Sequence, residues 1–206
     1  MRPLPRLHAF TDAHLLTLPE LGIRAAAIAA AGSAVALHAR AGGVPDAVLT
    51  AGALRLLALA RPPEASVFVS GRPDIAAAVG AHGVQLRADD LSPIDARRVM
   101  PRGWIGRSVH SREEGIVAIA DGADFLVVGN IYETPSHPGR PAAGPKLVSQ
   151  VADLGRPVIA IGGITPDRAA EVKAAGAYGI AAIRGLWMAA DPAAATLAML
   201  APWSET

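Results

Sequence analysis

A glycine pair, Gly162-Gly163, has the residue type and the setting for binding an anion. The pair follows an apolar run over residues 157–161, which predicts a strand buried on both faces, and Thr165-Pro166-Asp167 then opens a helix. Glycines let an anion approach backbone N–H groups, and the start of a helix adds a positive dipole. A second apolar run, Gly179–Ile183, ends at Arg184. Loops after the last two strands of a β/α barrel commonly hold phosphate, so we predict a phosphate site here; a tight turn without a ligand is the alternative.

Polar side chains also gather where the other predicted strands end. In a barrel, the carboxyl ends of the strands meet at one mouth, so these side chains are expected to converge on a small-molecule site. The arginines among them suit an anionic ligand, although each could instead be an ion-paired surface residue. The polar residues at strand ends are Thr11, Asp12, His38, Arg40, Ser70, Gln85, Arg87, Arg107, Ser108, His110 and Asn130.

Three residues near the predicted mouth could exchange protons. His110 follows the predicted strand 104–107, while Glu133 and His137 lie in a long loop, residues 130–145, that is rich in proline. Histidine titrates near neutral pH, and long loops in compact domains are often functional. The alternatives are structural: His110 packs in a strand-to-helix turn, and Glu133 orders the loop. Asp89-Asp90 could hold Mg²⁺, but helix capping is favoured for this pair.

Short apolar runs alternate along the chain with alanine-rich helical segments. The predicted strands are Leu7–Thr11, Ala34–Ala39, Ser66–Val69, Gly83–Leu86, Trp104–Arg107, Phe125–Gly129, Pro157–Ile161 and Gly179–Ile183. The predicted helices are Leu18–Ala31, Asp46–Ala60, Pro73–Ala81, Pro93–Met100, Arg112–Asp121, Lys146–Asp153, Pro166–Ala175 and Gly185–Met199. Eight strand–helix units predict an α/β protein, a single-domain (β/α)8 TIM barrel over residues 1–206, with a doubly wound open sheet as the alternative.

Composition excludes several classes of protein. The 206 residues carry a formal net charge of +1, which gives no electrostatic case for nucleic acid, and contain no cysteine. Lys146 and Lys173 are the only lysines and neither ends a predicted strand, which disfavours a Schiff-base aldolase. The apolar stretch 25–37 is too short to span a membrane, and the N-terminus lacks a signal core. We expect a cytoplasmic protein that does not bind membranes; whether it forms a homo-oligomer stays open.

Three long motifs stand out in the second half of the chain: GRSVHSREE at residues 106–114, GADFLVVGNIYETPSHPG at 122–139 and VIAIGGITPDRAAEVKAAGAYGIAAIRGL at 158–186. Together, and in this order, they resemble the thiamine phosphate synthase/TenI family. AFTD at residues 9–12 and DIAAAVGAHGVQL at 74–86 extend the resemblance over nearly the whole chain. The family fold is a β/α barrel. The resemblance implies a small-molecule phosphate ligand, held by Gly162, Gly163, Ile183 and Arg184.

The family has two main branches. Synthases join a pyrimidine pyrophosphate to a thiazole phosphate with Mg²⁺ and release pyrophosphate. TenI-type proteins tautomerise a thiazole carboxylate phosphate without a metal. Synthases typically carry QLREK where this chain has His38-Ala39-Arg40-Ala41-Gly42, and an Asn-Asp pair where it has Ser70-Gly71. Asp90 matches the second metal-binding aspartate of a synthase.

The TenI branch fits the remaining residues better. His38 with Arg40, GRSVHS and Glu133-Thr134 look TenI-like, although the acid/base histidine of that branch corresponds to Asn130. The sequence therefore favours a TenI-like thiazole tautomerase, an isomerase that needs no cofactor. A divergent synthase with Mg²⁺ at Asp90 and a non-catalytic binder of thiazole or thiamine phosphate are the alternatives. The candidate catalytic residues are His110, Glu133, His137 and Asn130, and the candidate substrate-binding residues are His38, Arg40, Arg107, Gly162, Gly163, Ile183 and Arg184.

Overall fold

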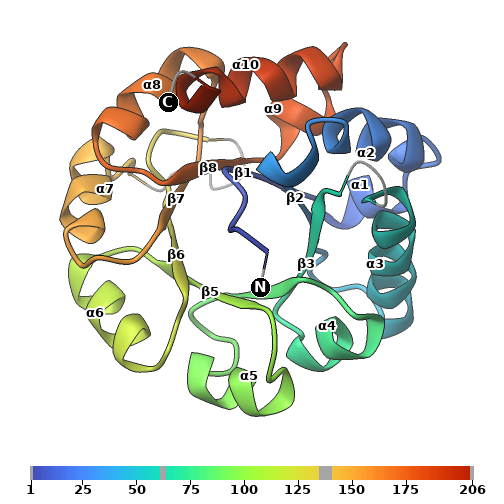
Figure 1. Ribbon diagram of the computed structural model, residues 1–206, viewed down its shortest axis with the longest axis horizontal. Coiled ribbons are helices and arrows are strands. Elements are labelled where there is room, and N and C mark those ends of the chain that lie inside the picture. The colour runs from blue at the N-terminus through green and yellow to red at the C-terminus, as the bar shows by residue number, and fades with distance from the viewer. Residues whose placement is uncertain (1, 61–63, 135–140, 205–206) are drawn as a thin grey trace.

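Eight short parallel strands close into one barrel, with helices around it (Figure 1). The computed structural model of the protein describes residues 2–60, 64–134 and 141–204. The strands are β1 (Leu7–Phe10), β2 (Val35–Ala39), β3 (Ser66–Ser70), β4 (Gly83–Leu86), β5 (Trp104–Val109), β6 (Phe125–Val128), β7 (Val158–Ile161) and β8 (Gly179–Ala182). Each strand pairs with the next, and β8 pairs with β1. The predicted barrel is confirmed, and the open-sheet alternative is wrong.

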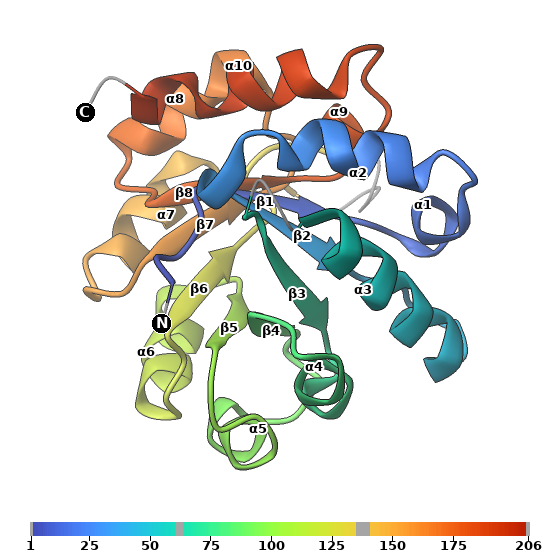
Figure 2. The ribbon, with the colours of Figure 1, turned by 45° about the vertical axis from the view of Figure 1, so that its right-hand side comes forward.

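The helices lie outside the barrel (Figures 1 and 2). They are α1 (Ala13–Thr17), α2 (Leu21–Ala29), η1 (Gly32–Ala34), α3 (Asp46–Ala60), α4 (Pro73–Val79), α5 (Pro93–Val99), α6 (Arg112–Ala120), α7 (Pro145–Ala152), α8 (Pro166–Ala174), α9 (Arg184–Trp187) and α10 (Pro192–Ser204). The predicted single helix Gly185–Met199 is wrong, because α9 ends at Trp187. A new helix begins at Pro192, and the Asp191 side chain accepts a hydrogen bond from the Ala194 N–H at 3.0 Å.

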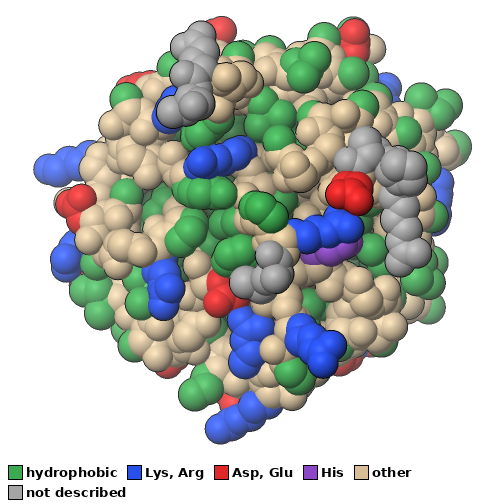
Figure 3. Space-filling model, viewed as in Figure 1, with side chains coloured by type: hydrophobic (Ala, Val, Ile, Leu, Met, Phe, Trp, Pro, Cys, Tyr) green, Lys and Arg blue, Asp and Glu red, His purple; other side chains and the backbone are tan. Residues whose placement is uncertain are grey.

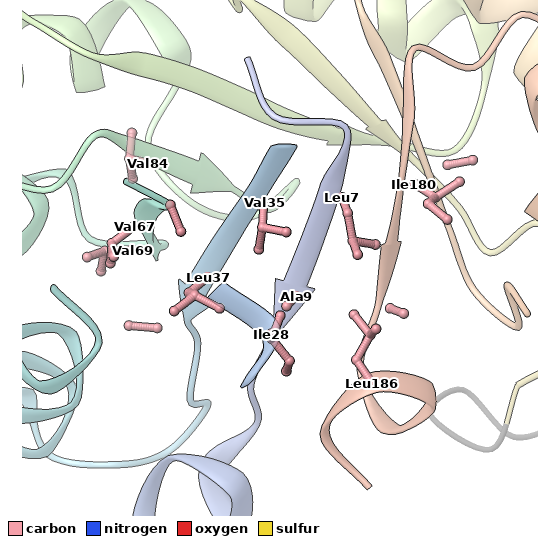
Figure 4. Packing of buried hydrophobic residues seen from close by; sticks show 14 of the residues in the cluster. Leu7, Ala9, Ile28, Val35, Leu37, Val67, Val69, Val84, Ile180 and Leu186 are labelled. Carbon is pink, nitrogen blue, oxygen red and sulfur yellow. The ribbon is translucent and has the colours of Figure 1, made fainter. Parts of the chain in front are cut away.

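The main hydrophobic core lies between the strands and the surrounding helices. Leu7 and Leu37 are fully buried and belong to β1 and β2, while Ile28 and Leu186 approach them from α2 and α9 (Figure 4). Because strands of a parallel barrel are covered on both faces, they appear in the sequence as continuous apolar runs. This is why the predicted strands agree with the observed ones to within about two residues at each end.

A second core fills the barrel interior. Phe68 on β3 and Phe125 on β6 meet edge to face, with their ring centres 5.9 Å apart. Gly83 and Gly106 make room for these rings, since an added Cβ would lie 2.3 Å from the Phe68 ring and 2.2 Å from the Phe125 ring. The barrel is thus packed rather than hollow, so a ligand site must lie at one of its ends.

The N-terminal segment closes one end of the barrel. Leu4 is buried there, and its carbonyl accepts a hydrogen bond of 2.7 Å from the Tyr178 hydroxyl. Arg6 joins the end of η1 to β8, because its N–H donates to the Ala34 carbonyl and its carbonyl accepts from the Ile180 N–H. Figure 3 views the face that carries the N-terminus, where basic side chains are scattered among apolar ones. None of the described helices is long and apolar enough to cross a membrane.

Candidate active site

A cavity of about 610 Å³ lies at the other end of the barrel, where the strands end. Most of the predicted site residues line it. They are Arg40, His110, Asn130, Glu133, Gly162, Gly163, Ile183 and Arg184, and they come from the connections after β2, β5, β6, β7 and β8. Gln85 and Ser108 add polar groups, and the Gln85 side-chain amide donates to the Ser108 hydroxyl at 2.6 Å. These side chains meet at the carboxyl ends of the parallel strands, as the sequence analysis predicts.

The glycine pair forms a tight turn on one side of the cavity. Both glycines have positive φ, 101° at Gly162 and 61° at Gly163. A Cβ on Gly162 would lie 2.8 Å from the Asn130 Cα, and one on Gly163 would lie 2.6 Å from the Glu133 carbonyl oxygen. The Gly162 carbonyl accepts from the Tyr132 N–H at 3.0 Å. The turn is thus fitted against residues 130–133, and only glycine satisfies both its conformation and its contacts.

Arg168, in the first turn of α8, braces this turn from behind. Its guanidinium donates to the Gly163 carbonyl at 2.8 Å and lies 4.4 Å from the centre of the Tyr132 ring. The Tyr132 hydroxyl in turn donates to the Glu171 carboxylate at 2.5 Å. Burial, followed by the hydrogen bond and charge of Glu171, raises the pKa of Tyr132 to about 12. Arg168 also lines the cavity. The sequence analysis missed it, although its place in the first turn of the helix behind Gly162-Gly163 was a usable signal.

Removing Arg168 is expected to weaken anion binding at the glycine turn. Arg168→Ala deletes both the bond to the Gly163 carbonyl and a positive charge beside the cavity, so the Kd for inorganic phosphate should rise about tenfold. Arg168→Lys keeps the charge but loses the planar contact with Tyr132 and should give a smaller rise. Isothermal titration with phosphate measures both. Arg156→Ala, which removes an exposed arginine ahead of β7, is the control. Equal Kd values in all four proteins would contradict the assigned position of Arg168.

Two arginines line the cavity from the connections after β2 and β4. Arg40 is partly buried at the end of β2, where its N–H donates to the Thr11 hydroxyl at 2.9 Å. Burial, and then the positive charge of Arg87, lowers the pKa of Arg40, while Asp12 opposes the shift. Arg87 follows β4 and also lines the cavity. These two cations face the same space, which suits a ligand that carries negative charge.

His110 and Asn130 line the cavity from the connections after β5 and β6. The ring Nδ1 of His110 lies 3.2 Å from the Glu114 carboxylate, which also accepts from the His110 N–H at 2.8 Å. Glu114 therefore holds the ring in place. Asn130 is 7 % exposed, and its carbonyl accepts from the Ala143 N–H at 3.0 Å. The asparagine thus joins the two ends of the long loop that follows β6.

The structure places two predicted site residues away from the cavity, and a third is not among the residues it describes. His38 does not line the cavity: it is fully buried inside the barrel, 2.8 Å from the His8 ring and stacked on Phe10. Arg107 donates to the carbonyls of Ala88 and Leu91, both at 2.9 Å, and so supports the connection after β4. His137 lies outside the described residues.

The acidic groups after β4 do not fit a magnesium ion. The Asp90 carboxylate accepts from the Arg87 N–H at 2.7 Å and pairs with the Arg87 guanidinium at 3.1 Å. The end of β3 adds Ser70 and Gly71, neither of which carries a carboxylate. Residues 2–60, 64–134 and 141–204 contain no group of three acidic, histidine or cysteine side chains that could hold a metal. Magnesium is usually held by one or two carboxylates together with water and substrate phosphates, and here the two carboxylates after β4, Asp89 and Asp90, already lie 3.7 and 3.1 Å from the Arg87 guanidinium.

Comparison with known proteins identifies the family. The model of the family described as thiamine monophosphate synthase matches residues 7–186. A thiamine-phosphate synthase of Thermus thermophilus is 45% identical over 147 residues, covering 70% of this chain and 71% of the relative. That of Salinispora tropica is 37% identical and covers 97% of this chain and 98% of its own length. A solved structure, the thiamine phosphate pyrophosphorylase from Pyrococcus furiosus, superimposes with a TM-score of 0.83 at 32% identity, covering 97% of this chain and 96% of that one.

The names of these relatives support the transferase alternative better than the tautomerase interpretation. The solved structure shares the closed barrel, and the family model extends from β1 into α9, so it covers every strand that contributes to the cavity. With the barrel, the cavity at its mouth and the sequence match in agreement, the chain belongs to the thiamine monophosphate synthase family.

Proposed function

We propose that this protein is a transferase that joins a pyrimidine pyrophosphate to a thiazole phosphate and releases pyrophosphate. The observation that carries the proposal is a single cavity with anion-binding groups in two places. Gly162-Gly163 and Arg184 line it from the connections after β7 and β8, and Arg40 and Arg87 line it from the connections after β2 and β4. Each of the two substrates carries phosphate, so each needs its own anion site. The names of relatives that are 37% and 45% identical support the same reaction.

In this arrangement the glycine turn anchors the thiazole phosphate. The Gly162 carbonyl accepts a hydrogen bond from the Tyr132 N–H, and the Gly163 carbonyl accepts one from the Arg168 guanidinium. Because both carbonyls are turned to these partners, the backbone N–H groups are the part of the turn that would bind an anion. Arg184 adds positive charge beside it. A phosphate fixed at this point holds the thiazole ring over the barrel mouth, where the second substrate meets it.

The arginine side of the cavity then binds the pyrophosphate of the other substrate. As the bond from the pyrimidine to the pyrophosphate breaks, the bonding electrons and the negative charge remain on the leaving group, while a bond to the thiazole forms. Arg40 and Arg87 lie where they stabilise that charge. The Gln85–Ser108 hydrogen-bonded pair also lines the cavity and offers polar contacts to a ring.

A second candidate is the metal-free tautomerisation of a thiazole carboxylate phosphate. The observation that favours it is the pairing of Asp90, the residue that matches a metal-binding aspartate of synthases, with Arg87. Glu133 lines the cavity and could move a proton there. His110 also lines it, held by Glu114 at 3.2 Å. Asn130 cannot exchange a proton at neutral pH, so this activity would depend on Glu133, His110 or His137.

The two candidates differ in their products. The purified protein is incubated with thiazole phosphate and pyrimidine pyrophosphate, and separately with thiazole carboxylate phosphate, with added Mg²⁺ and with a chelator. Pyrophosphate release, followed by ³¹P NMR, is expected in the first mixture. Isomerisation in the second mixture alone would favour the tautomerase. Binding of thiazole phosphate without turnover in either mixture would contradict both and leave a non-catalytic binder.

A further inference from the structure

We propose that arginine side chains alone hold the pyrophosphate group in this chain, so that the pyrophosphate binds without a divalent cation. The inference rests on the proposed transferase function, because that function supplies the pyrophosphate. The supporting observations are the hydrogen bonds and ion pairs of Arg40, Arg87 and Asp90. Arg40 and Arg87 both line the cavity.

The carboxylate that matches a synthase metal ligand, Asp90, is already bound, and the exposed Asp89 beside it lies 3.7 Å from the same guanidinium. Asp90 has a side chain that is only 10 % exposed, and the Arg87 guanidinium lies 3.1 Å from one of its oxygens. The other oxygen accepts from the Arg87 N–H at 2.7 Å. Both oxygens are thus used by the same neighbour. A magnesium ion at Asp90 would have to displace the guanidinium and would gain one carboxylate in return.

The neighbouring strand end supplies no second carboxylate and has little room for one. Gly71 has a φ of 74°, a conformation that side chains rarely adopt. An added Cβ there would lie 3.1 Å from an Asp90 oxygen. The Gly71 N–H donates to the Gln85 carbonyl at 2.8 Å, which fixes this position against β4. The end of β3 therefore fits closely around Asp90 as it is, paired with Arg87.

Arginine supplies the positive charge that a cation would otherwise bring. Arg40 is held in place because the Thr11 hydroxyl lies 2.9 Å from both its N–H and its carbonyl. Arg40 and Arg87 line the same cavity, and the positive charge of Arg87 adds to the effect of burial in lowering the pKa of Arg40. Two guanidinium groups with planar donor sets match the oxygens of a pyrophosphate and stay charged at every relevant pH. Asp90 then orients Arg87 rather than a metal.

The test is the binding of inorganic pyrophosphate to the whole protein, measured by isothermal titration in a chelator and again with excess Mg²⁺. We expect binding in the chelator, with a Kd that Mg²⁺ does not lower. Arg40→Gln should raise the Kd in the chelator about ten- to a hundredfold, and Arg40→Lys should raise it less. Arg55→Gln removes the same charge from an exposed position on α3 and should leave the Kd unchanged. Circular dichroism of each variant checks that it folds.

Two results would overturn the inference. One is pyrophosphate binding that requires Mg²⁺, and the other is an Arg40→Gln Kd equal to that of the unchanged protein. Neither result would refute the proposed transferase function, because turnover with Mg²⁺ is measured in a separate experiment. Conversely, metal-free pyrophosphate binding without any transferase turnover would refute the proposed function and not the arginine site. The two proposals therefore fail in different experiments.

Discussion

Replacing Gly162 with alanine is expected to lower kcat/KM for the transferase reaction about 100-fold, the loss that a displacement near 1 Å at a reacting site can cause. The new Cβ would lie 2.6 Å from the Asn130 Cβ and 2.8 Å from its Cα. The backbone at φ 101° is also strained for any side chain. The glycine turn and the loop after β6 would both have to move, and the thiazole phosphate would lose its anchor.

Gly155→Ala is the matched control for this variant. Gly155 has a φ of 78°, but an added Cβ there meets nothing within 4 Å, and the residue lies between α7 and β7, away from the cavity. It should lose stability from backbone strain of about 1–3 kcal/mol and keep its kcat/KM. Steady-state kinetics and urea unfolding separate the two effects. Equal kcat/KM values in both variants would contradict the assigned role of the turn.

Acidification is expected to unfold the barrel through two buried histidines. His8 and His38 are fully buried, and their rings share a hydrogen bond of 2.8 Å. Burial lowers the pKa of His8 to about 3, against the effect of the Pro5 carbonyl. Burial, and then the charges of His8 and Arg40, also lowers the pKa of His38 well below its usual value. Both rings are therefore neutral in the folded protein at neutral pH.

The sign of the effect follows from proton uptake. Below pH 6.5 the unfolded chain protonates both histidines, while the folded protein does not until much lower pH. The free energy of unfolding should therefore fall as the pH drops below about 6.5, by about 1.4 kcal/mol per pH unit for each histidine, and the contribution of His8 should continue to fall toward pH 3. Urea unfolding between pH 7.5 and 4.5 measures this slope. The double variant His8→Gln/His38→Gln should show a flatter slope, whereas exposed His14→Gln should not.

NMR of the imidazole rings in the unchanged protein tests the same claim should the double variant fail to fold. Two rings are expected to stay neutral down to about pH 4.5 while the protein remains folded. Titration of every histidine near pH 6.5 would contradict the prediction, as would an unchanged slope in a folded double variant.

The barrel could be predicted because its strands are short, apolar and buried on both sides. The run Pro157–Ile161 illustrates this, since β7 spans Val158–Ile161. Helix boundaries were harder, because alanine-rich sequence continues across real breaks. The segment 185–199 has the composition of one helix, yet the protein ends α9 at Trp187 and begins α10 at Pro192. Asp191 and Pro192 were the signal for that break.

For the candidate site, the sequence was enough to predict which strand-to-helix connections meet at the mouth of the barrel. Depth along the barrel was the harder part, because residues two apart on a strand point to the same face and the sequence does not say which of them reaches the mouth. His38 and Arg40 lie two positions apart at the end of β2, yet His38 points into the barrel core and Arg40 lines the cavity. Only the depth of each residue along the barrel separates them. Arg168 was missed because its role comes from contacts with Gly163 and Tyr132 that form only in the folded protein.

The central claim is that one cavity holds two anionic groups in two separate places. A crystal structure of the protein with thiamine phosphate and pyrophosphate, the products of the proposed reaction, tests it most directly. We predict the phosphate of thiamine phosphate at Gly162-Gly163 and Arg184, and the pyrophosphate at Arg40 and Arg87. A thiamine phosphate whose phosphate lies at Arg40, or a pyrophosphate bound away from both arginines, would contradict the account.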